Sequence, residues 1–186
     1  VPRQRLEFVY DSQSRRVRKV VKSFSSTSQS FVVTSDTRFL YDGWNVIAEL
    51  EASPSLPVSS SPRLAATYAW GLDLSGTETG AGGVGGLLLE ALYSATSTTG
   101  NNSQPLPTSV LAPLYDGNGN VLAYAVCSTG QIVARYEGDP FGKLLIKDED
   151  TSVAGRLHHQ FSTKYADDET GLLDYINRIY QPSQGR

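Results

Sequence analysis

The chain has 186 residues, of which 39% are hydrophobic and 19% charged, and its formal net charge at pH 7 is -3. This length suits one modest domain or one segment of something larger, and the charge gives no reason to expect a nucleic-acid partner. No apolar run approaches the roughly 20 residues of a membrane-spanning helix, and the single cysteine, Cys127, excludes an internal disulfide and a thiolate-rich metal site.

The first 52 residues indicate β-hairpins. Short β-branched and aromatic runs alternate with Gly, Asn, Asp and Ser, which tolerate turn geometry. The clearest hairpin joins 38–41 to 46–50 through a turn over 42–45. The Ser/Thr-rich stretch 23–35 predicts a surface linker, although the short run 31–33 within it has the composition of a strand.

Residues 53–109 differ in composition from the stretches around them. Ser and Pro dominate 52–62, and Ser, Thr, Asn and Pro dominate 95–108. Such segments are either disordered linkers or insertion loops between hairpins. Between them, the Gly-rich stretch 80–93 carries three leucines, and we expect an irregular or short helical segment there.

A second hairpin region covers residues 110–150. Its strands are expected at 121–127 and 131–136, with Gly130 free to adopt positive φ in the turn between them. Alternation along 121–127 predicts that Cys127 is a small buried hydrophobe. Farther on, the tyrosines and isoleucines of 173–180 favour a strand over a helix.

One sequence unit recurs along the chain. Tyr10-Asp11, Tyr41-Asp42-Gly43 and Tyr115-Asp116-Gly117 each join a tyrosine to an Asp-led turn, and an alternating run follows. The Asp can accept a backbone N–H two residues on, and Gly or Asn supplies the reversal. One such hairpin is marginally stable alone, so copies must pair. The pattern predicts an all-β fold of consecutive antiparallel hairpins in a curved sheet, with long irregular loops.

The sequence motifs around these turns resemble the YD repeats and the associated core of bacterial Rhs proteins. Phe8-Val9-Tyr10-Asp11, the turn from Tyr115 to Asn120, and Asp139-Pro140-Phe141-Gly142 resemble the repeats. The stretch from Phe161 to Arg186 resembles the core. The resemblance divides the chain into YD-repeat hairpins (1–52), a Ser/Pro/Gly-rich insertion and connecting segment (53–109), further hairpins (110–150) and an incomplete core segment (151–186).

The resemblance implies an architectural role. In that family the repeats wind into a hollow shell, the core closes one end, and the shell encloses a C-terminal effector, often a toxin. The implied partners are the remaining repeats of the same polypeptide and such an effector, and the implied location is secreted or cell-surface. The implied structural motif residues are Tyr10, Asp11, Tyr41, Asp42, Gly43, Tyr115, Asp116, Gly117, Asn120, Asp139, Pro140, Gly142, Phe161, Tyr165, Glu169, Gly171, Pro182, Gly185 and Arg186.

The chain departs from the family pattern at three places, one of which is 173–177, where the family has a more aromatic run. Gly138 stands where the family usually has a tyrosine, and His158-His159-Gln160 replaces a word that usually reads Asn-Pro-Phe-Arg. The family's Asp-Pro cleavage motif is also missing after the core signature. We therefore expect no self-cleavage within this chain.

Several motifs imitate chemical sites. Residues 80–85 spell GxGxxG, but no convincing strand precedes them and no acidic residue follows at the spacing of a dinucleotide site. Residues 116–120 imitate the start of an EF-hand loop, but Val121 and Cys127 stand where Gly and Glu are required. We expect neither a cofactor nor a metal site.

The remaining reactive groups favour structural interpretations. Cys127 with His158 or His159 could pair a nucleophile with a base, and the acidic clusters 148–150 and 167–169 could do acid–base work. The sequence around them instead favours a packed position for Cys127 and solvated turns for the acidic clusters. We therefore expect no enzyme. The alternative function is an adhesion or carbohydrate-binding module that uses Trp44 and Trp70, although inward packing is the favoured role of both tryptophans.

Overall fold

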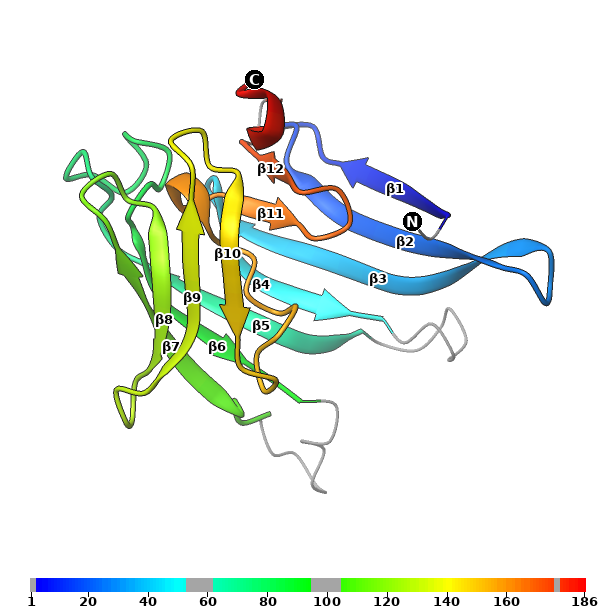
Figure 1. Cartoon of the computed structure of the whole chain (residues 1–186), viewed down its shortest axis with the longest axis horizontal. Helices are drawn as coiled ribbons and strands as arrows, with labels where there is room; N and C mark the ends of the chain where they lie inside the picture. Colours follow the sequence, from blue (N-terminus) through cyan, green and yellow to red (C-terminus); the bar gives the residue numbers. More distant parts are fainter. Residues whose placement is uncertain (1–2, 53–61, 95–104, 176–177) are drawn as a thin grey trace. The chain divides into compact units, whose positions relative to one another are not determined.

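The computed structural model describes residues 3–52, 62–94, 105–175 and 178–186, which form two antiparallel sheets (Figure 1). Ten strands follow one another in sequence order in the larger sheet, and three form the smaller one. This confirms the expected all-β fold of consecutive hairpins. The strands of the larger sheet are β1 (Gln4–Tyr10), β2 (Arg16–Ser25), β3 (Ser30–Asp42), β4 (Asn45–Glu51), β5 (Arg63–Trp70), β6 (Leu87–Leu92), β7 (Ser109–Tyr115), β8 (Val121–Val126), β9 (Ile132–Gly138) and β10 (Leu144–Glu149).

The smaller sheet contains β11 (Tyr165–Asp167), β12 (Leu172–Asp174) and β13 (Ile179–Tyr180). Two short 3₁₀ turns, η1 (Phe161–Thr163) and η2 (Pro182–Gln184), flank it in the sequence. The strand expected over 173–180 is thus divided between β12 and β13, and residues 176–177 lie outside the described part. No helix in the described ranges is long and apolar enough to cross a membrane.

The chain divides into two compact units. The first contains residues 1–67 and 93–106, and the second contains 68–92 and 107–186. Strand β5 therefore begins in the first unit and ends in the second. The domain boundaries expected from the sequence remain predictions.

The core of the first unit mixes apolar side chains with buried cationic ones, Arg16 and Lys19. Val20, Val21 and Phe39 are among its buried residues, and Arg16 is only 2% exposed. The guanidinium of Arg16 lies 5.3 Å from the ring centre of Phe8 and 5.2 Å from that of Phe39. Because an aromatic face attracts a cation, the two rings help to compensate its burial.

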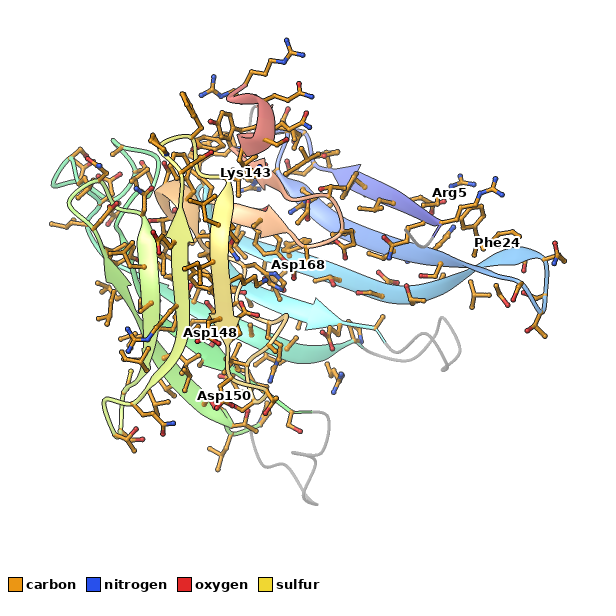
Figure 2. All side chains as sticks on the ribbon, in the orientation of Figure 1. Arg5, Phe24, Lys143, Asp148, Asp150 and Asp168 are labelled. Carbon is orange, nitrogen blue, oxygen red and sulfur yellow. The ribbon has the colours of Figure 1, made fainter. Side chains whose placement is uncertain are left out.

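The expected linker over 23–35 is wrong. Strand β2 continues to Ser25 and β3 begins at Ser30, so this stretch is the end of a long hairpin, where Figure 2 labels Phe24. Phe24 pairs across the strands with Phe31, with ring centres 5.5 Å apart. Arg3 lies over both rings. The cross-strand aromatic contact stabilises strands whose Ser/Thr composition alone suggested a loop.

Two further expectations fail in the second unit. Residues 87–92 form strand β6 rather than a helical segment, because Glu90, Ala91 and Leu92 pair with β7. Tertiary pairing here overrides a weak local preference. Cys127 is exposed, since β8 ends at Val126 and Cys127 enters the turn. The two expected loops over 52–62 and 95–108 lie mostly outside the described residues, because 53–61 and 95–104 are not among them.

Candidate functional site: hairpin turns and the C-terminal segment

Four hairpins share one irregularity at their turns. Tyr10, Tyr115 and Gly138 end their strands and pair with the first residue of the outgoing strand. Tyr41 lies one residue before the end of β3 and pairs with Val46, the second residue of β4. The next residue of the outgoing strand is then skipped, which makes a bulge. The skipped residues are Val17, Ile47, Leu122 and Leu145. Gly138 thus occupies the position that tyrosine fills in the other three hairpins.

The predicted aspartates close three of these turns in the same way. Asp11 Oδ1 accepts the backbone N–H groups two and four residues on, each at 2.9 Å. Asp116 Oδ1 makes the equivalent bonds at 2.8 and 2.9 Å, and Asp139 Oδ1 at 2.9 and 3.0 Å. Although burial raises the pKa of Asp116, hydrogen bonds from Asn120, Asn118 and Gly119 lower it overall. The aspartates thereby satisfy N–H groups that the reversal leaves unpaired.

The turn after Tyr41 is shorter. Asp42 pairs with Asn45 across it, and Gly43 adopts a φ of 55°, which is in the left-handed region that favours glycine. Trp44 in this turn is 39% exposed.

The repeat tyrosines tie each turn to the preceding strand. The Tyr41 hydroxyl donates to the carbonyl of Arg16, the first residue of β2, at 3.0 Å. The Tyr115 hydroxyl donates in the same way to Leu87, the first residue of β6, at 2.6 Å. Tyr41 and Tyr115 therefore each join one hairpin to the hairpin before it. Tyr10 lies on the first strand, β1, and its side chain is 47% exposed.

Residues 160–164 and 180–185, called the C-terminal segment below, lie against the hairpin turns, and the first of these stretches binds the turn led by Asp116. The N–H of Ser162 donates to Asn120 Oδ1 at 2.8 Å, and the Thr163 hydroxyl donates to the carbonyl of Gly119, also at 2.8 Å. Thr163 adopts a φ of 54°, which is strained for a β-branched residue. The two bonds hold the segment in this conformation.

The same segment packs on the turn led by Asp139. Gly142 lies so close to the Phe161 ring that an added Cβ would be 2.3 Å from it. Tyr180 stacks on Phe161, with ring centres 6.2 Å apart, and its hydroxyl donates to the carbonyl of Phe141 at 2.9 Å. Pro182 is buried nearby in the sequence, and Gly185, with a φ of 65°, lies against Phe141.

The Gly-rich loop folds around an internal carboxylate. Asp73 accepts the N–H groups of Ala81 at 2.7 Å and Gly83 at 3.1 Å, and also the hydroxyl and N–H of Ser75. The Ser75 hydroxyl and these N–H groups lower the pKa of Asp73 to about 2. The GxGxxG word is therefore closed by a side chain at the N–H groups that a nucleotide phosphate would need.

The Gly-rich loop is also fastened to the C-terminal segment. The N–H of Gly85 donates to the Thr163 hydroxyl at 2.8 Å, and the Lys164 ammonium donates to the carbonyl of Gly82. Thr163 therefore bridges the loop and the turn led by Asp116. One short stretch of chain holds three loops of the second unit together.

The second histidine of the pair, His159, lies in a cage of aromatic rings. His159 is 2% exposed, and its ring contacts those of Tyr68, Trp70 and Tyr165 at centre distances of 4.8 to 5.8 Å. Burial, together with His158 and Lys164, lowers the pKa of His159 to about 3. A ring enclosed in this way is not available as a base or a metal ligand.

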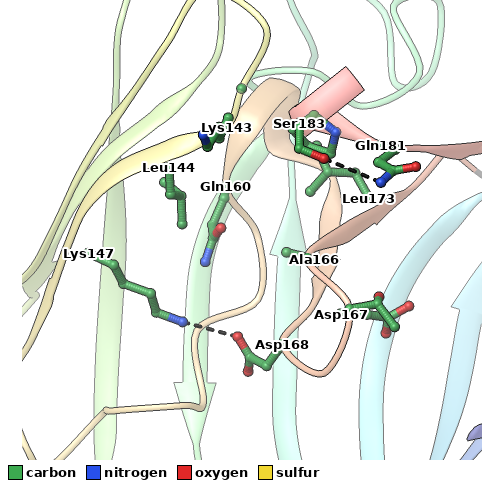
Figure 3. A pocket seen from close by; sticks show the side chains of 14 residues that line it. Lys143, Leu144, Lys147, Gln160, Ala166, Asp167, Asp168, Leu173, Gln181 and Ser183 are labelled. Carbon is green, nitrogen blue, oxygen red and sulfur yellow. Dashed lines mark hydrogen bonds and ion pairs between the residues drawn. The ribbon is translucent and has the colours of Figure 1, made fainter. Parts of the chain in front are cut away.

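A pocket of about 330 Å³ lies beside the C-terminal segment (Figure 3). Lys147 and Asp168 form an ion pair at its wall at 3.0 Å, and His158 Nδ1 lies 3.4 Å from the other oxygen of Asp168. Burial raises the pKa of Asp168, but hydrogen bonds with His158 and Lys147 hold it well below its usual value.

The acidic clusters are less solvated than the sequence indicated. Asp167 is 3% exposed, and the Glu149 side chain accepts a hydrogen bond from the Tyr136 hydroxyl at 2.7 Å. Asp150 closes the next turn by accepting the N–H of Ser152. Among the described residues, no group of three His, Cys, Asp or Glu side chains could hold a metal ion.

The other predicted motif residues have less prominent roles. Tyr165 is buried, and Glu169 and Gly171 lie in the β11–β12 turn, where Gly171 donates to the Asp167 carbonyl at 2.7 Å. Pro140 is exposed, and Gly117 has open space around it. The carbonyl of Arg186 accepts the N–H of Gln181 at 2.6 Å. Sequence reasoning missed Asp73, Thr163 and Lys164, whose partners are distant in the chain.

No protein-family model and no curated protein matches the chain. Solved structures do match. The one described as "Crystal Structure of TcdB2-TccC3-TEV" has a TM-score of 0.64 and 19% identity over 100% of this chain, and "Crystal Structure of TcdB2-TccC3" has a TM-score of 0.60 and 18% identity over the same extent. The chain spans 7% and 8% of those chains. At this level of identity the likeness establishes a shared fold.

Proposed function

We propose that this chain is a structural segment of an Rhs-type shell that encloses or presents a C-terminal effector belonging to the same polypeptide. The observation that carries the proposal is the seating of residues 160–164 and 180–185 on the hairpin turns and the Gly-rich loop. A segment that binds successive turns at once is suited to closing the end of a repeat array. The likeness to TcdB2-TccC3 chains supports the same role.

We also propose that the segment performs no catalysis. Its titratable groups serve as structural acceptors and donors: Asp73 holds the Gly-rich loop, Asp168 pairs with Lys147, and His159 fills an aromatic cage. The partners in this proposal are the neighbouring repeats and the effector, and the location is secreted or cell-surface.

Protease protection of the effector in the full-length polypeptide tests the shell role. Under native conditions we expect the effector to resist proteinase K, and Phe161→Ala, which removes the ring from the Asp139 turn, to make it sensitive. Ile146→Ala, at a residue 50% exposed on β10, is the control and should leave protection unchanged. Electron microscopy shows whether the variant is still assembled. The proposal is contradicted if the effector is digested as fast in the wild-type protein as in the Phe161→Ala variant.

A carbohydrate-binding role has one supporting observation, the exposed Trp44 in the Asp42 turn. Trp70, the other predicted platform residue, packs on His159, with ring centres 5.5 Å apart. A glycan array separates the two functions. Hits that disappear in Trp44→Ala favour adhesion, and an array without hits favours the shell.

A further inference from the structure

Strand β10 is the last strand of the larger sheet and has a neighbour, β9, on one side only. None of the backbone hydrogen bonds made by the described turns and loops involves residues 144–149. At the centre of the strand, Leu145 and Ile146 are 62% and 50% exposed. An unpaired strand edge with exposed apolar side chains is a template for another strand.

Two exposed charges flank this apolar pair at equal distances along the chain. Lys143 lies two residues before Leu145, and Asp148 lies two residues after Ile146. Figure 2 labels both, at opposite ends of the strand. In the described ranges, neither side chain forms an ion pair. The edge therefore has a cation at one end, an anion at the other and an apolar centre.

The other charged side chains of β10 are already engaged within the chain. The Lys147 ammonium lies 3.0 Å from an oxygen of Asp168 and 3.4 Å from one of Glu149. The Glu149 side chain is 7% exposed and also accepts the Tyr136 hydroxyl at 2.7 Å. Lys143 and Asp148 are therefore the charges of this edge that remain for a partner.

This edge is complementary to itself when two copies run in opposite directions. Antiparallel pairing centred on Leu145 and Ile146 brings Lys143 of each copy beside Asp148 of the other. Parallel pairing would instead bring like charges beside each other, which opposes association. Because a two-fold axis relates the antiparallel strands, each contact occurs twice and the assembly closes as a dimer.

We propose that two copies of this chain form a dimer by antiparallel pairing of their β10 edges. Leu145 and Ile146 meet those of the second copy at the two-fold axis, and two Lys143–Asp148 ion pairs lie on either side of it. The backbone groups of the two edges form the ladder between them. The dimer does not rest on the shell function.

The other free edge of the sheet, β1, complements β10 less well. Antiparallel pairing with β1 would bring Lys143 beside the apolar end of that strand, which contains Val9. It would leave Arg5 for the acidic end of β10, and Arg5 already pairs with Glu7 at 3.0 Å. Such head-to-tail pairing also continues from copy to copy without closing. A dimer that does not grow further thus separates the two arrangements.

Analytical ultracentrifugation of the whole chain tests the dimer. Every protein in the series carries Val9→Lys, which opposes pairing through β1, and the parent should form dimers and no larger species. Lys143→Glu and Asp148→Lys each turn two attractive contacts into repulsive ones, so each should weaken dimerisation about tenfold. An equimolar mixture of these two variants should form a heterodimer with restored affinity, because both contacts are then attractive.

Arg5→Glu on β1 is the matched control. It reverses a positive charge whose side chain is 63% exposed, and it changes the net charge as much as Lys143→Glu does. Because Arg5 is not on β10, this substitution should leave the dimerisation constant unchanged. A loss of affinity equal to that of Lys143→Glu contradicts the proposed contact.

The proposal is overturned if the parent stays monomeric at the highest attainable concentration, or if it forms larger oligomers in place of dimers. A mixture of the two charge variants that associates no more tightly than either alone also overturns it. Where a variant does not fold, amide hydrogen exchange of the wild-type chain at low and high concentration decides. Exchange at residues 144–149 should slow as dimers form, and unchanged exchange there excludes pairing through β10.

Discussion

Single residues with special backbone or packing requirements hold the C-terminal segment in place. Gly142 combines a φ of 83° with direct contact of its Cα with the Phe161 ring, so both the conformation and the space exclude a side chain. Thr163 shows the opposite solution, because its hydroxyl bridges Gly85 and Gly119 while its backbone is strained. Such residues are replaceable only at a cost that depends on their neighbours.

Gly142→Ala should lower the free energy of unfolding by roughly 2 kcal/mol or more, since the methyl group meets an aromatic ring at a positive φ. The matched control is Gly117→Ala, at a glycine in the preceding turn with no atom near its Cβ position. The control should change stability by less than about 0.5 kcal/mol. Urea unfolding of both variants makes the comparison, and equal effects would show that Phe161 does not restrict Gly142.

His159 makes stability depend on pH. Burial lowers its folded-state pKa from 6.5 to about 3, so below pH 6.5 the unfolded chain binds a proton that the folded chain does not. Stability should therefore fall as the pH drops from 6.5 towards 3, by at most about 1.4 kcal/mol per pH unit from this group. The lowered pKa of Asp168 acts in the same direction, but only as the pH falls below 3.8, the ordinary pKa of an aspartate.

His159→Phe tests this dependence, because it keeps an aromatic ring in the cage and removes the titration. Between pH 6.5 and 4.5, the free energy of unfolding should fall less steeply in the variant than in the wild-type chain. Parallel profiles for the two proteins are the result that contradicts a neutral, buried His159.

At the scale of the elements, the hairpin turns follow from local sequence and the strands only in part. Each Asp-led turn is closed within five residues, so its signal is visible in the sequence. Strand β6 was missed because its contacts are remote: Leu87 is tied to Tyr115, 28 residues later. The contacts of the C-terminal segment could not be predicted from the sequence either, because Ser162 and Lys164 bond to residues 42 and 82 positions away in the chain.

Asp116→Ala should destabilise the second unit by about 1–3 kcal/mol, because two backbone N–H groups and the Asn120 amide lose their acceptor. Asp116→Asn keeps one oxygen for the backbone groups and should cost less. Asp42→Ala is the control from the shorter turn, where no such bonds to the side chain occur among the described residues. Thermal unfolding ranks the variants, and an equal loss for Asp116→Ala and Asp42→Ala would contradict this role.

At the scale of the whole chain, the larger sheet ends in β1 and β10 and does not close. Strand β1 exposes Phe8, Val9 and Tyr10 at 38%, 49% and 47%. An open strand with exposed apolar side chains is a template for pairing with another strand. We therefore expect the isolated chain to associate through this edge as its concentration rises.

Val9→Lys should reduce this association, because a charged side chain on an edge strand opposes pairing. Ala125→Lys is the control, at a half-buried position on β8 that pairs with Ala112 of β7 on one side and with Ile132 of β9 on the other. Light scattering over a range of concentrations measures the difference. A wild-type chain that remains monomeric at high concentration contradicts the expectation.

The carboxylate of Asp73 has a consequence for how the Gly-rich loop could change during evolution. As part of the chain, it competes with any dissolved anion as a tethered ligand, and tethering corresponds to an effective concentration in the millimolar range or above. Dissolved phosphate compounds therefore occupy few of these N–H groups while the Asp73 carboxylate is in place. Replacing Asp73 by a neutral residue would remove the occupant and leave the N–H groups of Ala81 and Gly83 without an acceptor. The same substitution would release the loop from its anchor, so these N–H groups cannot be opened to another anion without loosening the loop.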